Sequence, residues 1–189
     1  ASERKNFMRV EEIDTPALVV DLDSFEENLQ RYQEYFDKHD IGLRPHIKTH
    51  KCVAMAHMQM RQGAIGITCQ KVSEAEVMVA GGLDGDVLIP FNVIGRQKLE
   101  RLMALATRAR VTGSADSIYT VNGLSSAAVG LDVSLGVIVE LDQGRTGVPT
   151  PELAVELGKK IDESPGLELR GIMIMPAPPN IRPFLQEVI

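Results

Sequence analysis

Short apolar runs alternate with longer amphipathic segments along almost the whole chain. The runs are rich in Val, Ile and Leu, which is typical of strands covered on both faces in a parallel sheet. The segments between them place apolar residues three or four positions apart, which predicts helices that bury one side. The predicted strands are residues 16–22, 41–47, 64–70, 86–92, 110–115, 134–142 and 167–175.

Helix start and stop signals flank the amphipathic segments. Asp23 with Glu26, and Ser73 with Glu76, each predict an N-cap and its capping-box partner. Gly63 follows a periodic segment and predicts a helix end. The predicted helices cover residues 25–36, 53–60, 74–80, 99–105, 121–128, 151–161 and the opening of a seventh helix at 183–189.

Seven strands separated by helices predict a parallel β/α architecture, either a doubly wound open sheet or a (β/α)8 barrel. The first strand–helix turn, residues 21–25, has no glycine-rich phosphate fingerprint, which disfavours a dinucleotide-binding sheet. A complete barrel typically has about 250 residues. We therefore expect residues 1–189 to be the N-terminal part of one barrel, an incomplete TIM-type barrel with strands one to seven.

Composition narrows the functional classes. The net charge of −6 argues against nucleic acid as the main partner, because phosphate binding needs a spread basic surface. No apolar run approaches the roughly 20 residues that span a bilayer, and the N-terminus lacks a signal-peptide core, so we expect no membrane partner and a cytoplasmic location. Cys52 and Cys69 form no metal-binding pattern and are expected to be buried free thiols.

One cationic cluster stands out in this acidic chain, in residues 44–51, which read RPHIKTHK. Strand alternation places Leu43, Pro45 and Ile47 on one side. It places the basic residues on the other side, at positions 44, 46, 48 and 50. In a barrel, Lys48 would lie at the carboxyl end of its strand, where active sites are found. Neighbouring cations there favour an anionic ligand and disfavour the ammonium form of a lysine, as imine chemistry requires.

Two further roles for the cluster stay open. The residues could form a solvated basic edge of the sheet. Alternatively, a helix beginning at Pro45 would place His46 and His50 one turn apart as metal ligands, but Ile47 stands where the zinc-protease motif has Glu.

Four motifs carry a resemblance to a known family: DTPALVVDLDSFEENL, LRPHIKTHK, GITCQKVSEAEVMVAGG and DVLIPFNVIG. In order and spacing they resemble the fold type III pyridoxal-phosphate (PLP) enzymes related to D-threonine aldolase and eukaryotic-type D-serine dehydratase. This family has an alanine-racemase-like N-terminal barrel followed by a C-terminal β domain. The resemblance covers essentially the whole chain and implies that the eighth strand and the β domain are not present in it.

The resemblance implies a role for several residues. Lys48 would hold PLP as a Schiff base, and Lys51 would face outward. Gln70 would lie near the cofactor, and Arg145 would contact its ring oxygen. His46, like Arg44, would either contact the cofactor or make structural hydrogen bonds inside the barrel.

The chain departs from the family pattern in two places. The glycine turn at residues 142–148 is two residues shorter than the usual D-x-G-x-x-R-x-G-V. Met175 stands where relatives tend to have a tyrosine, and a thioether cannot donate a hydrogen bond.

The implied activity is that of a PLP-dependent lyase, which cleaves a D-3-hydroxy amino acid into glycine and an aldehyde. The alternatives are D-serine dehydratase-like β-elimination, or a PLP-binding protein without catalysis. The resemblance also implies a homodimer of the full-length protein and a divalent metal (Mn, Mg or Zn). The metal's ligands would lie outside this chain, so no metal ligand is assigned here.

Overall fold

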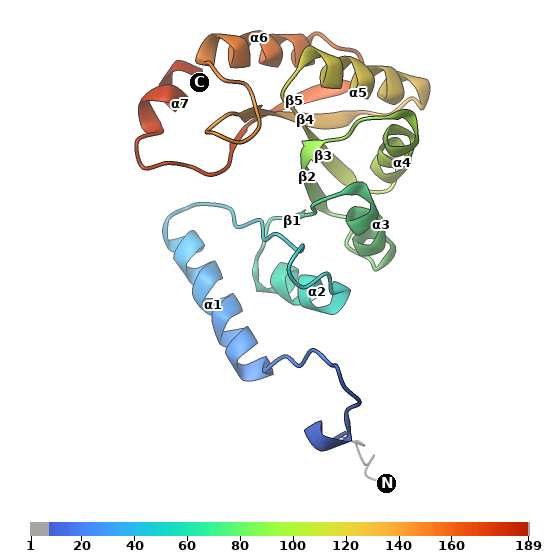
Figure 1. Ribbon diagram of the computed structural model, residues 1–189, viewed down its shortest axis with the longest axis vertical. Coiled ribbons are helices and arrows are strands. Elements are labelled where there is room, and N and C mark those ends of the chain that lie inside the picture. The colour runs from blue at the N-terminus through green and yellow to red at the C-terminus, as the bar shows by residue number, and fades with distance from the viewer. Residues whose placement is uncertain (1–7, 189) are drawn as a thin grey trace.

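The computed structural model describes residues 8–188, in which helices and parallel strands alternate along the chain (Figure 1). A short 3-10 turn, η1 (Val10–Glu12), comes first. The helices are α1 (Leu22–Lys38), α2 (Val53–Gln62), α3 (Val72–Ala80), α4 (Arg96–Ala106), α5 (Ile118–Gly130), α6 (Pro151–Asp162) and α7 (Arg182–Val188). The strands are β1 (Ile67–Thr68), β2 (Asp86–Asn92), β3 (Arg110–Ala115), β4 (Leu135–Leu141) and β5 (Leu167–Ile174).

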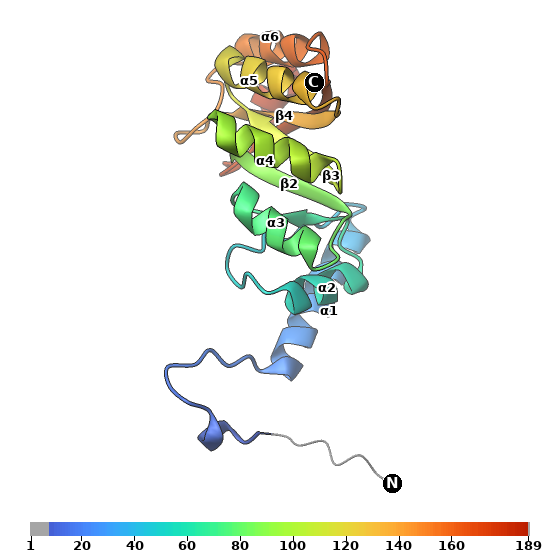
Figure 2. The same ribbon diagram turned by 90° about the vertical axis from the view of Figure 1, so that its right-hand side faces the viewer.

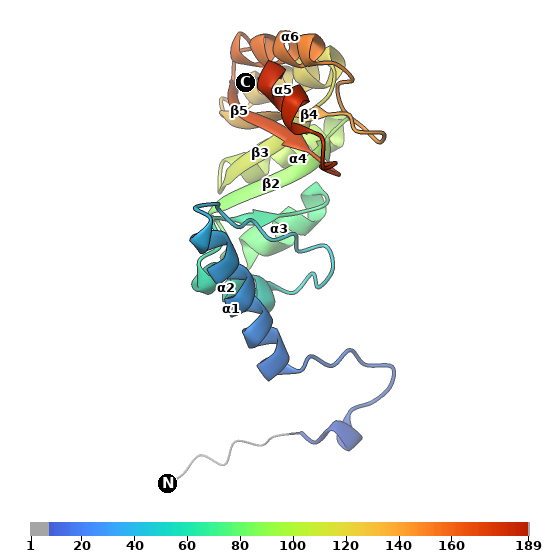
Figure 3. The ribbon, with the colours of Figure 1, turned by 90° about the vertical axis from the view of Figure 1, so that its left-hand side faces the viewer.

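The strands form one parallel sheet in the order β1-β2-β3-β4-β5, so each strand lies beside the next one in sequence. Helices α3 to α6 form a row along one face of this sheet (Figure 2). Figure 3 shows the opposite side, with α7 near β5 and α1 beyond the β1 end. A doubly wound sheet carries helices on both faces and reverses its strand order, whereas a barrel does neither. The structure therefore confirms the barrel-type prediction and excludes the doubly wound alternative.

The main hydrophobic core lies between the sheet and the row of helices. Alternate strand residues such as Val87, Val111 and Val137 are fully or almost fully buried there, and Leu102 and Ile161 cover them from α4 and α6. Burying such a side chain contributes about 1.5–3 kcal/mol. The strand residues between them point to the other face of the sheet, which would be the inside of a barrel.

The later strands were predicted well. The predicted strands 86–92 and 110–115 have the bounds of β2 and β3, while 134–142 and 167–175 exceed β4 and β5 by one residue at one or both ends. In the predicted strand 64–70, only Ile67 and Thr68 are assigned as β1. The long apolar runs are the reliable ones because both of their faces are covered.

The predicted strand at residues 16–22 is wrong. This segment is irregular up to residue 21, and within residues 8–188 it pairs with no strand. Leu18 is fully exposed, and Val19 and Val20 are also exposed. A strand is defined by hydrogen bonds to a neighbour, so an apolar run without one remains unassigned.

The predicted strand at residues 41–47 is only partly formed. It runs parallel to β1, with backbone hydrogen bonds from Ile65 N to Leu43 O, Thr68 N to Pro45 O, and Ile47 N to Thr68 O. Only one ladder bridge results, between His46 and Thr68. Pro45 has no N–H to donate back to the neighbouring strand, which explains why the ladder is incomplete.

Two predicted helix caps are also wrong by a few residues. Asp21, not Asp23, is the N-cap of α1, because its carboxylate accepts a hydrogen bond of 2.8 Å from Ser24 N. Helix α3 follows Lys71 as its N-cap, so Ser73 lies inside the first turn. Glu76 is no capping-box partner and forms an ion pair with Arg101 on α4 instead.

Helix α7 confirms the predicted opening of a seventh helix, although residue 189 lies outside the described residues. Residues 1–7, the beginning of the stretch searched for a signal peptide, also lie outside them. Among residues 8–188, no helix combines the length and apolar character needed to cross a bilayer.

Candidate active site

The candidate site lies along the edge of the sheet where the parallel strands end. Lys48 follows the segment that runs beside β1, Gln70 follows β1, and Asn92 ends β2. The loop after β4 contains Arg145, and Met175 follows β5. Carboxyl ends of parallel strands meet at one edge, so the fold gathers these residues on the side where barrel enzymes bind their ligands.

Lys48 lies in a tight turn that interrupts the strand alternation. Ile47 is fully buried and anchors the turn, and Lys51 N donates a 2.8 Å hydrogen bond back to Ile47 O. The side chain of Lys48 is exposed, while His50 is half-buried and accepts a 3.0 Å hydrogen bond from Cys52 N. Since residues 47–50 form a turn and not a helix, the helical His46–His50 metal pair is wrong.

His46 lies directly beside Lys48. Its Nδ1 accepts a 3.3 Å hydrogen bond from the backbone N–H of Lys48. Burial, and then the Lys48 charge, lower the pKa of His46 below 6.5, while hydrogen bonding to Gln70 and the charge of Glu74 oppose that shift. A lowered pKa favours a neutral imidazole at pH 7. Lys48 and Gln70 are thus both neighbours of His46.

Glu74 completes this group, and the sequence patterns did not predict it. It is buried in the first turn of α3, where its Oε2 accepts a 2.8 Å hydrogen bond from Gln70 N. Its Oε1 lies 3.4 Å from Lys51 Nζ. The one feature of the sequence that points to Glu74 is its position four residues after Gln70, which ends the predicted strand. The capping-box pattern points to Glu76 instead. Lys51, expected to face outward, is exposed and forms this ion pair with Glu74 on α3.

The short glycine turn after β4 is well ordered by its own hydrogen bonds. The Asp142 carboxylate accepts from Gly144 N at 2.7 Å and from Arg145 N at 2.9 Å. The guanidinium of Arg145 lies 5.2 Å from the ring centroid of Phe91, near the carboxyl end of β2. Arg145 therefore reaches across β3 on the site edge. In the part of the chain that the structure describes, it makes no hydrogen bond to the residues around Lys48.

The inner face of the sheet carries buried polar atoms near this edge. Asn92 and Ser114 are register neighbours on β2 and β3, and Glu140 lies on the corresponding face of β4. Glu140 Oε1 accepts a 2.7 Å hydrogen bond from Thr146 Oγ1. Asn92 Oδ1, Ser114 Oγ and Glu140 Oε2 have no hydrogen-bond partner among the described residues. Unsatisfied buried polar atoms are costly, so this face suits a bound polar group such as PLP.

Arg44 belongs to the other end of the sheet. Its guanidinium binds the Asp86 carboxylate through two hydrogen bonds, of 2.7 and 3.2 Å, at the start of β2. This position favours the structural role over cofactor contact. Met175 is exposed after β5.

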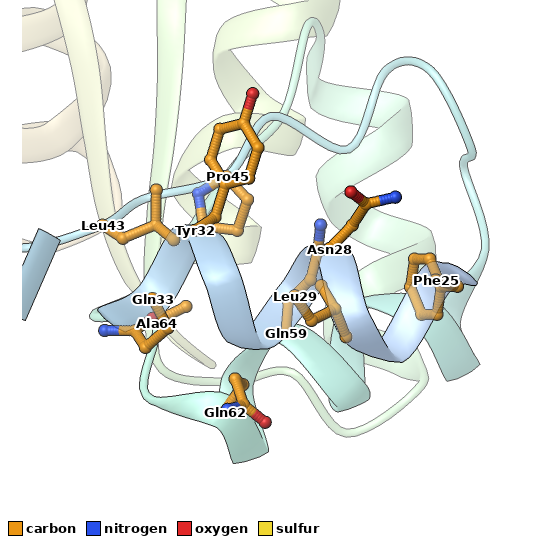
Figure 4. Close-up of a pocket in the computed structure, with 10 residues that line it drawn as sticks. All are labelled: Phe25, Asn28, Leu29, Tyr32, Gln33, Leu43, Pro45, Gln59, Gln62 and Ala64. Atoms are coloured by element: carbon orange, nitrogen blue, oxygen red, sulfur yellow. The ribbon is translucent and has the colours of Figure 1, made fainter. Parts of the chain in front are cut away.

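A cavity of about 280 Å³ lies away from the Lys48 group, between α1 and α2 (Figure 4). It contains no lysine, histidine or carboxylate in its lining, and Leu43 and Pro45 close it from the connecting segment. Leu43 and Pro45 thus point to the same side, as strand alternation predicted, and that side faces the helices. The cavity is a gap in helix packing, with the lining Phe25, Asn28, Leu29, Tyr32, Gln33, Leu43, Pro45, Gln59, Gln62 and Ala64.

The site residues offer amine and hydrogen-bonding chemistry. No group of three or more His, Cys, Asp or Glu side chains in residues 8–188 is arranged to hold a metal ion. Cys69 is buried, and burial raises the pKa of its thiol to about 12, which makes it a poor nucleophile; Cys52 is half-buried, and both thiols are free.

The fold and this edge define a barrel-type β/α protein with a lysine at the carboxyl end of a strand. Residues 20–183 match the alanine racemase N-terminal domain, and the chain belongs to this family. It is 41% identical over 162 residues to a D-threonine aldolase from Arthrobacter sp, covering 85% of this chain and 42% of that protein.

Two solved structures show the same relationship. The D-threonine aldolase from Filomicrobium marinum has a TM-score of 0.84 and 45% identity, over 86% of this chain and 44% of that one. The D-threo-3-hydroxyaspartate dehydratase from Delftia sp. HT23 has a TM-score of 0.78 and 30% identity, over 86% and 43%. This chain thus spans less than half of the length of these relatives.

Proposed function

We propose that this chain forms the cofactor-binding part of a PLP-dependent lyase that acts on D-3-hydroxy amino acids, most like D-threonine aldolase. The observation that carries the proposal is the exposed Lys48 at the carboxyl edge of the sheet, next to His46, which accepts a hydrogen bond from the Lys48 backbone N–H and is hydrogen-bonded to Gln70. The relatives named as a D-threonine aldolase and as a D-threo-3-hydroxyaspartate dehydratase support the substrate class.

Each site residue has a distinct task in this proposal. Lys48 would hold PLP through its side-chain amine, and the bound cofactor would supply an electron sink for charge at the substrate Cα. The lowered pKa of His46 favours its neutral form, and because its Nδ1 accepts from the Lys48 N–H, the neutral ring would carry its proton on Nε2. Gln70 would orient the imidazole of His46 through the hydrogen bond of its side-chain amide. Arg145, whose guanidinium lies over Phe91, would donate a hydrogen bond to the cofactor.

Reduction with borohydride tests the proposal. In the PLP-loaded full-length protein, peptide mapping should find the reduced pyridoxyl group on Lys48, and Lys48→Ala should abolish both the adduct and turnover. Lys98→Ala, which changes an exposed lysine on α4, is the control and should retain both. A wild-type adduct at some other residue, or none at all, would contradict the proposal.

A dehydratase is the second candidate, because the Delftia dehydratase shares this fold at 30% identity. It would eliminate water from D-serine, and hydrolysis of the resulting imine would take up water again and give pyruvate and ammonia. The aldolase would instead give glycine and an aldehyde from D-threonine. Assaying both substrates with one protein sample separates the two activities.

A PLP-binding protein without catalysis is the third candidate. Met175 and the short turn at residues 142–148 favour it, since each departs from the pattern of catalytic relatives. This candidate predicts a visible PLP band and no turnover of any D-amino acid. Metal-dependent turnover would exclude it.

The proposal includes a divalent metal, a homodimer and a cytoplasmic location for the whole protein. The metal would be a Lewis acid at the substrate hydroxyl, held by ligands outside this chain. Turnover with and without a chelator tests the metal, and the native mass tests the dimer.

A further inference from the structure

Two lysines lie three positions apart in the turn that begins at Ile47, and the proposed function needs only one of them to hold the cofactor. Lys48 is exposed and forms no ion pair within residues 8–188. Lys51 is 59% exposed at its side chain and pairs with Glu74 at 3.4 Å. Exposure alone therefore does not explain a preference between the two amines, whereas their electrostatic partners differ.

Glu74 is well placed to keep one of the two lysines as an ion-paired ammonium. Its side chain is only 8% exposed, and each carboxylate oxygen has its own partner. Oε2 accepts from Gln70 N at the end of β1, which fixes the carboxylate, and Oε1 faces Lys51 Nζ. A buried carboxylate that lost the lysine would be left without its counter-charge, which is costly.

The ion pair between Lys51 and Glu74 matters because only a neutral lysine amine can react with the aldehyde of PLP. A neutral amine attacks the aldehyde carbon with its nitrogen lone pair and forms the C–N bond. The carbonyl oxygen leaves as water with the two amine hydrogens, which leaves a C=N double bond. An ammonium group has no lone pair and cannot start this reaction. A lysine held as an ammonium by a carboxylate is therefore removed from competition.

We propose that Glu74 is a positioning residue that directs the cofactor aldehyde to Lys48 by holding Lys51 as an ion-paired ammonium. The inference rests on the proposed function, because it concerns which of two lysines carries PLP. It assigns to Glu74 a role in site selection, separate from any contact with the substrate.

The test compares the distribution of the adduct between the two lysines. Wild-type, Glu74→Gln and Glu76→Gln proteins are loaded with PLP and reduced with borohydride, and the fraction on each lysine is measured by peptide mass spectrometry. Glutamine at position 74 keeps an acceptor oxygen for Gln70 N and removes only the charge. Glu76 lies on the same helix but pairs with Arg101, so its variant is the matched control.

The wild type and Glu76→Gln should carry the adduct on Lys48. Glu74→Gln should raise the Lys51 share by about fivefold, as expected for a partly exposed ion pair. An unchanged distribution in Glu74→Gln, or equal labelling of both lysines in the wild type, would overturn the inference. Absence of any wild-type adduct on Lys48 would instead overturn the proposed function.

A second measurement covers the case in which Glu74→Gln does not fold. Salt at about 1 M shortens the screening length to about 3 Å and weakens a pair that is open to solvent on the lysine side. The Lys51 share in the wild type should then rise relative to low salt. A share that does not change with salt would count against the role of Glu74.

Discussion

At the residue scale, burial of two histidines couples the site to pH. Burial is the largest cause that lowers the pKa of both His46 and His50, and the Lys48 charge adds to it at His46. The unfolded chain, with histidine near 6.5, then binds more protons than the folded chain as the pH falls. The stabilisation is fully present above the unfolded value and is lost as the pH falls through it toward the folded value.

We expect the free energy of unfolding to decrease on acidification from about pH 7.5 to about pH 5.5. His46→Gln should reduce this dependence, because one of the two half-buried histidines no longer takes up a proton. His39→Gln, which changes an exposed histidine after α1, should leave it unaltered. Urea unfolding at both pH values measures the effect. An equal change in the free energy of unfolding between the two pH values in the wild type and in His46→Gln would contradict the prediction.

Arg145 gives a second residue-scale prediction. Its guanidinium lies over Phe91, and its side chain makes no hydrogen bond to any residue that the structure describes, so its donors are available for a ligand. Arg145→Ala should weaken PLP binding by about tenfold, the loss of one charge-assisted hydrogen bond. Arg110→Ala, at the amino end of β3, should bind PLP normally. Absorbance titration measures both, and an unaltered affinity in Arg145→Ala would remove that residue from the site.

At the element scale, the turn after β4 depends on the backbone of Gly147. This residue has φ +121°, and a Cβ there would lie 2.5 Å from the carbonyl carbon of Leu141. Gly144, in the same turn, also has a positive φ of +89°, but a Cβ would meet no atom within 4 Å. Comparing an alanine substitution at the two glycines therefore distinguishes the cost of a steric clash from the cost of backbone strain.

Gly147→Ala should destabilise the chain by about 3 kcal/mol, because strain and overpacking act together. Gly144→Ala should cost about 1 kcal/mol, the strain of a left-handed residue alone. Urea unfolding of the two variants gives the difference. Equal destabilisation would show that the close approach at Gly147 relaxes freely.

The elements also show what the sequence could and could not predict. Strands with both faces covered, such as β2 and β3, were predictable because their apolar runs are continuous. The segment at residues 16–22 has the same pattern but pairs with no strand among residues 8–188, and pairing is a tertiary property that the pattern does not encode. The candidate site likewise has one part that the sequence predicts and one part that it does not. The position of Lys48 follows from strand direction, whereas the ion pair between Lys51 and Glu74 depends on how a turn meets a helix.

At the scale of the whole molecule, the chain combines a well-packed centre with an apolar segment at residues 16–22 that pairs with no strand in the part of the chain that the structure describes. Leu18 is fully exposed and Val19 and Val20 are exposed, while Leu102 is fully buried on α4. A contiguous exposed apolar run with free backbone groups favours association between copies of a chain. Leucine should therefore promote association between copies of the chain at position 18 and stabilise the fold at position 102.

Leu18→Lys should leave the free energy of unfolding of this 189-residue chain within about 0.5 kcal/mol, because no buried contact is lost. It should also raise the protein concentration at which light scattering detects association, since a charge interrupts the apolar run. Leu102→Ala is the counterpart and should cost about 2–5 kcal/mol through a core cavity, without improving solubility. A destabilisation by Leu18→Lys close to that of Leu102→Ala would show that residues 16–22 are packed in solution, and that this segment pairs as a strand.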